Sequence, residues 1–154
     1  VEVTAEGNII VSGLTIMSGY VADEENTRKV LKDGKIYGSD LGYVDDEGLI
    51  HLKGRQGDVI NVGGFKVDPS EVENAAASHD SVKDCICIAG THPVIGTVLK
   101  LLVVLADGAS LDKRSLALHL KSKLEPHKIP TYYESVDSIQ RTYNGKLDRK
   151  FYKK

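Results

Sequence analysis

The chain has 154 residues, 41% apolar and 27% charged, a composition typical of one ordinary globular domain or two small ones. Its formal charge is −2, from 20 Lys and Arg against 22 Asp and Glu, so no overall field favours nucleic acid or an anionic membrane. The longest apolar stretch, 98–106, is far shorter than the roughly 20 residues that a membrane span needs. We therefore expect no nucleic-acid partner and no membrane span.

The first half of the chain predicts short strands separated by turns. Up to Asp58 there are six basic and eleven acidic residues, a charge of −5. The run Asp45-Asp46-Glu47-Gly48 predicts a hairpin turn, because glycine readily takes the positive φ that such turns require. The strands are expected at 1–4, 9–12, 42–44 and 49–53.

From Val59 onward the charge is +3 and the pattern predicts strand, strand, helix, strand, strand, helix, strand. The first helix is expected from Pro69 to about Ser78, since Asp68 can cap its free amides and Glu71 stands where a capping box needs it. The strands are expected at 58–62, 65–67, 82–89, 97–106 and 132–136. This order favours a small α+β layer with two helices on one sheet.

The second helix and the end of the chain complete this pattern. Leu116, Leu120 and Leu124 recur at four-residue steps and mark one helix face, and Glu125-Pro126 would end the helix. The residues that follow the last strand include a basic tail, 141–154.

The cysteines and the single methionine bear on the chain's origin. Cys85 and Cys87 lie two residues apart in a predicted strand, where both side chains share one face. Such neighbours are badly placed to form a disulfide with each other, which predicts buried, reduced thiols and a cytoplasmic location. The only methionine is Met17, so we expect a processed chain or a piece of a longer one.

Several familiar sites are absent from the sequence. Gly145-Lys146 is followed by Leu147 and lacks the earlier glycine of a Walker-type phosphate loop. No Gly-x-Ser-x-Gly elbow occurs, and the five histidines show no pair at metal-ligand spacing. We expect structural or surface histidines and no metal site.

Three clusters could carry chemistry. Asp40 could accept two hydrogen bonds from a diol and Arg55 could donate to phosphate, although a turn aspartate and a surface arginine would look the same. Gly63 and Gly64 could let the backbone pass close to a ligand, or could only make a tight hairpin. Lys146 could place its ammonium on a phosphoryl oxygen, or could belong to a solvated basic tail.

In this order and spacing, the three clusters resemble the carboxy-terminal portion of the AMP-forming adenylating enzymes, the superfamily of acyl-CoA synthetases, peptide-synthetase adenylation domains and luciferases. Nearly the whole chain matches, including 125–130 ahead of the last cluster. Asp40 stands at the family's ribose-binding aspartate and Arg55 at its nucleotide-contacting arginine. Lys146 stands at its catalytic lysine.

The resemblance implies an α+β fold in three parts. Residues 1–54 would be the β-rich end of the large domain, and 55–58 a hinge that includes Gln56 and Gly57. Residues 59–154 would be the mobile carboxy-terminal domain, with a mixed sheet and two to three helices.

The resemblance also implies a function. The chain would be a fragment, inactive alone, of an ATP-dependent, AMP-forming carboxylic acid:CoA ligase, with ATP and Mg bound mainly by the large domain. Its parent would act in the cytoplasm, in fatty acid metabolism. Gly63, Gly64 and Lys66 would approach the thiol of CoA, and the glycine pair favours CoA as the acceptor. The alternatives are an adenylation domain acting on a carrier protein, or a small non-catalytic binding module with a basic tail. Exposed strands cut from the large domain could also make the piece self-associate.

The sequence departs from the family's pattern at several positions. The triplet that ends at Asp40 is Gly-Ser-Asp where Thr-Gly-Asp is usual, and Gln140 replaces a common proline. Lys66 stands where many members have arginine. The usual hinge Asp or Lys aligns with Gly57, which predicts a looser hinge.

Overall fold

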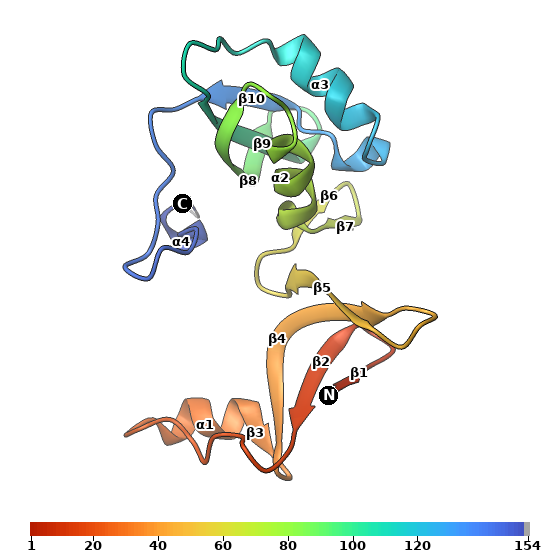
Figure 1. The fold of residues 1–154 in the computed structure, drawn as a ribbon, viewed down its shortest axis with the longest axis vertical. Helices are drawn as coiled ribbons and strands as arrows, with labels where there is room; N and C mark the ends of the chain where they lie inside the picture. The colour runs from red at the N-terminus through yellow and green to blue at the C-terminus, as the bar shows by residue number, and fades with distance from the viewer. Residues whose placement is uncertain (153–154) are drawn as a thin grey trace. The chain divides into compact units, whose positions relative to one another are not determined.

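A computed structural model describes residues 1–152 and divides the chain into two compact units (Figure 1). The first unit is Val1–Gly57, and the second begins at Asp58. Lys153 and Lys154, the end of the predicted basic tail, lie outside the described residues. Each unit has its own sheet structure.

The first unit is an antiparallel five-stranded sheet with one short helix. The strands run in the order β1-β2-β4-β3, and β5 pairs with β4. The predicted hairpin is confirmed, since β4 and β5 are antiparallel neighbours on either side of 45–48. The elements are β1 (Glu2–Val3), β2 (Asn8–Ser12), α1 (Glu24–Val30), β3 (Leu31–Lys32), β4 (Lys35–Val44) and β5 (Ile50–Arg55).

The sequence missed α1, β3 and the first seven residues of β4. Helix α1 is polar apart from Val30 and has no buried residue, so it has no apolar stripe to reveal it. Its cap is the usual one, because Asp23 accepts a hydrogen bond from the Asn26 amide at 3.1 Å. At Gly42 the strand pairing shifts, and a Cβ there would lie 2.5 Å from the His51 carbonyl oxygen, so only glycine fits.

The second unit has the predicted order of elements, with two additions. Strands β8 and β9 are antiparallel and β10 joins β9 in parallel, which makes the sheet mixed as expected. The expectation of a single sheet is wrong, because β6 and β7 form a separate two-stranded hairpin. The additions are a one-turn 3₁₀ helix and a short terminal helix, both too brief to show periodicity. The elements are β6 (Ile60–Val62), β7 (Phe65–Val67), α2 (Pro69–Ala77), β8 (Val82–His92), β9 (Gly96–Leu105), α3 (Lys113–Lys121), η1 (Pro126–Lys128), β10 (Tyr132–Ser135) and α4 (Arg149–Tyr152).

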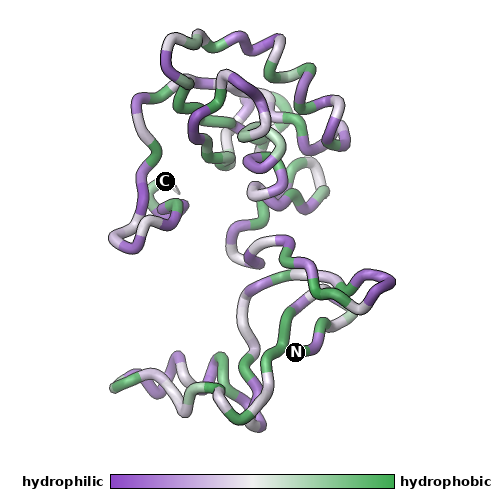
Figure 2. The backbone as a smooth tube through the Cα atoms, in the orientation of Figure 1, coloured by the Kyte–Doolittle hydropathy of each residue, from purple (hydrophilic) through white to green (hydrophobic). Residues whose placement is uncertain are grey.

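Two apolar clusters cover the two faces of the sheet of β8, β9 and β10. The larger joins the sheet to α2, α3 and the β6–β7 hairpin, and β9 is the apolar strand at its centre (Figure 2). Its buried members are Ile60, Val67, Val72, Ala76, Val82, Cys85, Cys87, Leu99, Leu101, Val103, Leu116 and Leu120. The smaller cluster is Ile86, Leu102 and Ile139, with Leu147 and Tyr152 packed against it. Leu147 and Tyr152 of the predicted basic tail therefore pack on one face of the sheet, while Lys146 and Lys150 remain exposed.

Two details of the helices differ from the sequence prediction. Asp68 caps α2 by accepting from the Ser70 amide at 2.9 Å, but Glu71 binds Lys128 at 2.8 Å and does not close a capping box. Helix α3 ends at Lys121, several residues before Pro126. Leu124 lies beyond the helix and still packs against the larger cluster.

Cys85 and Cys87 are buried, free thiols on one face of β8, as predicted. Burial raises the pKa of Cys85 to about 12, with smaller contributions from the charges of Glu73 and Asp84. Burial likewise raises the pKa of Cys87. Both thiols are protonated and unreactive at neutral pH.

Candidate active site

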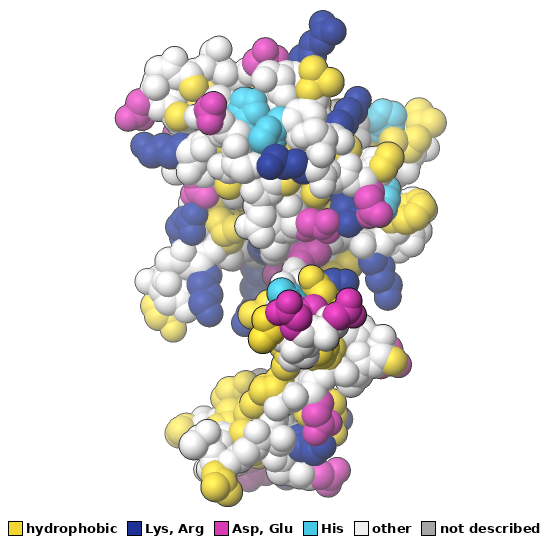
Figure 3. Space-filling view, turned by 45° about the vertical axis from the view of Figure 1, so that its right-hand side comes forward, with side chains coloured by type: hydrophobic (Ala, Val, Ile, Leu, Met, Phe, Trp, Pro, Cys, Tyr) yellow, Lys and Arg dark blue, Asp and Glu magenta, His cyan; other side chains and the backbone are white. Residues whose placement is uncertain are grey.

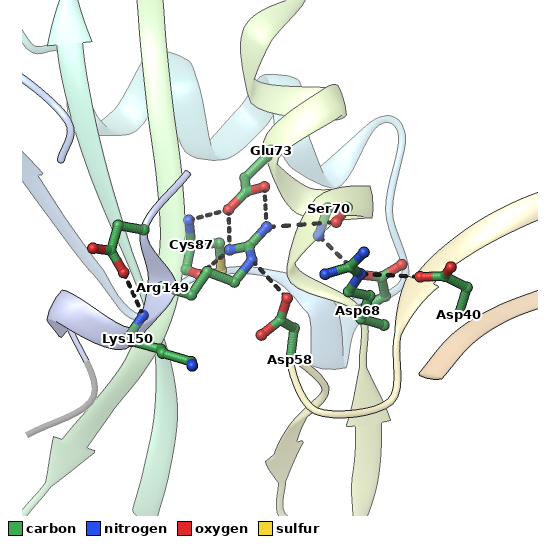
Figure 4. Close-up of polar contacts among 10 residues, drawn as sticks. Asp40, Asp58, Asp68, Ser70, Glu73, Cys87, Arg149 and Lys150 are labelled. Carbon is green, nitrogen blue, oxygen red and sulfur yellow. Dashed lines mark hydrogen bonds and ion pairs between the residues drawn. The ribbon is translucent and has the colours of Figure 1, made fainter. Parts of the chain in front are cut away.

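Asp40 and Arg55 face each other across the β4–β5 ladder of the first unit. They are register partners, and Arg55 Nε donates to Asp40 Oδ1 at 3.0 Å (Figure 4). The two side chains remain 50% and 58% exposed, so both keep hydrogen-bonding capacity for a ligand. The pairing continues to Gln56, whose amide donates to the Ser39 carbonyl at 2.8 Å. The next residue, Gly57, is exposed and ends the first unit.

Gly63 and Gly64 form the turn of the β6–β7 hairpin. Their φ angles are +56° and +93°, in the left-handed region that favours glycine. The Gly64 amide donates to Asn61 Oδ1 at 3.0 Å, which closes the turn, and no atom lies within 4 Å of a Cβ built at either glycine. Lys66 follows in β7 with an exposed side chain. The hairpin thus presents open backbone and one cation.

Strand β7 of the β6–β7 hairpin packs against η1. The Phe65 ring stacks on the His127 ring at 4.5 Å between centroids, with 19° between the planes. Lys128 in the same 3₁₀ helix binds Glu71 of α2 and Glu125, at 2.8 and 2.9 Å. The hydrogen bond that Lys128 donates to Glu71 is the main cause that raises the pKa of Lys128. The segment 125–130 therefore contacts the hairpin that carries the glycine turn.

Lys146 lies on a turn of the basic tail, with an exposed side chain. The Thr142 amide donates to the Lys146 carbonyl at 2.8 Å, and the Gly145 amide to the Thr142 carbonyl at 2.9 Å. Gly145 has a φ of +80°, which the turn requires. Within residues 1–152 the Lys146 ammonium has no hydrogen bond or ion pair. The backbone is ordered by the turn while the charge stays available.

Sequence reasoning missed a buried ion cluster around Arg149, drawn in Figure 4. Its guanidinium makes two 2.7 Å hydrogen bonds to Glu73, and its Nε lies 3.3 Å from Asp58. Glu73 also accepts from the Cys87 amide at 2.7 Å. Burial alone would lower the pKa of Arg149, but the hydrogen bonds and charge of Glu73, together with Asp58, outweigh it and raise the pKa.

The sequence did contain a signal for this cluster. Pro69, Val72, Glu73 and Ala76 follow the spacing of one helix face, and all four are buried. A carboxylate on a buried face needs a cationic partner, because an unpaired buried charge is very costly. The pattern could have predicted that partner, though not that it is Arg149.

The predicted site residues fall into three groups. Asp40 and Arg55 are paired within the first unit, whereas the glycine turn and Lys146 belong to the second. In the second unit, the hairpin of Gly63 and Gly64 packs into the larger apolar cluster, while Leu147, beside Lys146, packs into the smaller one. Lys146 and the glycine turn are therefore held by separate parts of the second unit.

Comparison with known proteins places this arrangement in a family. The AMP-binding enzyme C-terminal domain matches residues 71–146, a stretch that runs from α2 to Lys146. The chain belongs to the AMP-forming adenylating enzymes. It corresponds to a carboxy-terminal portion of them, which confirms the resemblance and the α+β fold.

Curated relatives in this family are CoA ligases. The chain is 35% identical to a long-chain-fatty-acid–CoA ligase of Bacillus subtilis over 94% of its own length and 26% of that protein. It is 37% identical to a feruloyl-CoA synthase of Amycolatopsis over 92% of its length and 29% of that protein. The chain therefore spans between a quarter and a third of these relatives.

Solved structures of the family share the fold. The o-succinylbenzoate CoA synthetase of Bacillus subtilis, in complex with an acyl-adenylate intermediate, matches with a TM-score of 0.89 and 29% identity, over 100% of this chain and 31% of that one. An amide bond synthetase from Marinactinospora thermotolerans matches with a TM-score of 0.87 and 31% identity, over 99% of this chain and 32% of that one. The name of the first protein specifies CoA, and the name of the second specifies amide bond synthesis.

Two kinds of feature are absent from the described residues. Within residues 1–152, no group of three or more His, Cys, Asp or Glu side chains could hold a metal ion. Over the same range, no helix combines the length and apolar character needed to cross a membrane.

Proposed function

We propose that the chain is part of an AMP-forming carboxylic acid:CoA ligase and supplies its adenylating lysine, Lys146. The observation that supports this most is an unpaired ammonium on a hydrogen-bonded turn, at the position where the family has its catalytic lysine. A fixed cation stabilises charge that develops in a transition state, since it needs no reorganisation during the reaction.

The proposed reaction has two steps. In the first, a carboxylate oxygen of the substrate bonds to the α-phosphorus of ATP while the bond to pyrophosphate breaks. Lys146 offsets the negative charge that builds on the α-phosphate and the carboxylate. In the second step, the sulfur of CoA bonds to the acyl carbon, AMP leaves, and the thiol proton passes to solvent. Lys146 has no role in this second step.

The other candidate residues have proposed roles in binding and movement. Asp40 accepts hydrogen bonds from the ribose hydroxyls and Arg55 donates to the phosphate, both from exposed positions. Gln56 and Gly57 are the hinge within 55–58, between a large-domain end at 1–54 and a mobile domain at 59–154. Magnesium is proposed to arrive with ATP, bound to its phosphates.

Gly63, Gly64 and Lys66 are proposed to guide the thiol of CoA. The open space beside both glycines supports this role, since a narrow pantetheine arm can pass along bare backbone. The CoA ligases among the relatives favour CoA over a carrier protein as acceptor. The named acids of these relatives differ, so a fatty acid is one member of the panel to test. A cytoplasmic location fits the two reduced thiols.

Pyrophosphate exchange by the full-length parent tests the proposal. A panel of carboxylic acids is assayed for ATP–pyrophosphate exchange with wild type beside Lys146→Ala. We expect acid-dependent exchange that falls by about 10²-fold or more in the variant, the scale for loss of one charge-stabilising group. Exchange that survives in Lys146→Ala would remove the assigned role.

The isolated 154-residue chain is expected to be inactive, because the proposed ATP site lies mainly in the large domain. Release of pyrophosphate by the isolated chain, abolished by Lys146→Ala, would contradict this expectation.

A further inference from the structure

The Lys146 turn cannot hold its own position. Its own hydrogen bonds include the two described above, one from Thr142 Oγ1 to the Lys146 carbonyl at 3.1 Å and one from the Asp148 amide to the Gln140 carbonyl at 3.0 Å. One isolated bridge joins Arg141 and Leu147. A two-stranded hairpin is marginal in water without further packing. Contacts outside the turn must therefore set where Lys146 points.

Arg141, which precedes the turn in the chain, supplies such a contact. Its Nη1 donates to the Gly145 carbonyl at 3.0 Å, and its Nη2 donates to Asp84 Oδ2 at 2.6 Å. One planar guanidinium thus bonds to the turn and to strand β8 together. A lysine could not reproduce this, because its ammonium has no rigid fork of donors.

Arg149 and Leu147 supply the contacts on the leaving side. Leu147 packs against the smaller apolar cluster, directly after Lys146. Arg149 reaches Glu73 of α2, the Cys87 carbonyl of β8 and Asp58, with a side chain only 13% exposed. The leaving strand of the turn is therefore tied to the sheet and to a helix.

We propose that Arg141 and Arg149 are positioning residues that hold the Lys146 turn against β8 and α2 and so aim the lysine ammonium. This rests on the proposed function, since it concerns the aim of the adenylating lysine. The pair of Arg141 and Asp84 is 43% and 33% exposed, so it contributes little to global stability. Removing it should loosen the turn without unfolding the unit.

Amide hydrogen exchange, measured on the 154-residue chain, tests the role of Arg141 without an activity assay. The amides of Thr142 and Gly145 report on the turn, and we compare Arg141→Gln with Lys83→Gln. Lys83 is the matched control, because it stands beside Asp84 on β8 and pairs with Asp107 at 3.6 Å. We expect both amides to exchange about tenfold faster in Arg141→Gln, the effect of losing one charge-assisted hydrogen bond. Equal rates in wild type and Arg141→Gln would overturn the proposal.

Arg149 is tested by a conservative variant, because removing its charge could unfold the unit. Arg149→Lys keeps a cation beside Glu73 and Asp58 but lacks the fork that bonds to Glu73 twice. We expect faster exchange at Thr142 and Gly145 with the thermal midpoint largely kept. Unchanged exchange at these two amides would limit positioning to Arg141 and overturn the two-sided arrangement.

Half-reactions of the full-length parent test the consequence for chemistry. In Arg141→Gln we expect kcat for adenylation to fall about tenfold with KM for ATP nearly unchanged, and thioester formation from a supplied acyl-adenylate to be unaffected. Lys146→Ala separates the two proposals. If Lys146→Ala leaves adenylation intact, the proposed function fails. The positioning roles of Arg141 and Arg149 are then tested by amide hydrogen exchange alone. If Lys146→Ala abolishes adenylation while Arg141→Gln matches wild type, only the positioning inference fails.

Discussion

The two units differ in how much core each one carries. Within residues 1–152, Ile9 and Ile10 are the buried apolar side chains of the first unit, and all the others belong to the second. The first unit also leaves large apolar side chains in water, with Leu14, Val21 and Leu52 at 105%, 98% and 75% exposure. Figure 3 shows apolar side chains of this unit, in yellow, at the surface. Stability of the chain should therefore depend mainly on the second unit.

The ion pairs of the two units differ in the same way. Asp40 and Arg55 are half exposed in the first unit, so their pair contributes little to stability. Glu73 and Arg149 are 10% and 13% exposed in the second, where a broken pair leaves a charge without water or partner. The pair proposed to bind the nucleotide is therefore exposed, whereas the pair that joins the end of the chain to α2 is buried.

The largest expected effect is therefore at Glu73. Glu73→Gln removes the charge that balances Arg149, and we expect a loss of about 3–5 kcal/mol in the free energy of unfolding. Denaturant unfolding of the full chain measures it. Glu71→Gln is the matched control on the same helix, since its carboxylate is 45% exposed and should cost less than about 1 kcal/mol. Similar losses in both variants would break the distinction between the two kinds of pair.

A smaller loss is expected from the core of the second unit. Leu120 is fully buried between α3 and the sheet, so Leu120→Ala should cost about 3 kcal/mol through lost contacts and a cavity. Because burial raises the pKa of Cys85 to about 12, thiol labelling near pH 8 requires the unit to open. Labelling should then accelerate about 100-fold in Leu120→Ala. Leu118→Ala, at a position 59% exposed on the same helix, should label like wild type.

The fold of the second unit could be predicted because its elements are long and strongly patterned. Asp68 and Pro69 marked the start of α2, and the spacing of Leu116 and Leu120 marked α3. The separation of the β6–β7 hairpin from the main sheet could not be predicted, since pairing between distant strands leaves no local pattern. Helix α1 was missed because it buries nothing.

Only part of the candidate site could be predicted from the sequence. Asp40, Arg55 and Lys146 were found by their order and spacing, and the ladder then showed that the first two are direct partners. The support of the lysine turn was hidden, because Arg141 and Asp84 lie 57 positions apart. A tail rich in Lys and Arg looks solvated until its partners on β8 and α2 are known.

The smallest effect is expected at Leu52 of the first unit. Because Leu52 is already 75% exposed, Leu52→Ala should change the free energy of unfolding by less than about 0.5 kcal/mol and leave thiol labelling at the wild-type rate.

The same side chain should matter for association, since we propose that the exposed apolar residues of this unit make the isolated chain self-associate. Sedimentation velocity should show a dimer or larger species in wild type and less of it in Leu52→Ala. A monomer at every wild-type concentration would contradict self-association. Labelling as fast as in Leu120→Ala would instead show that the two units share one cooperative core.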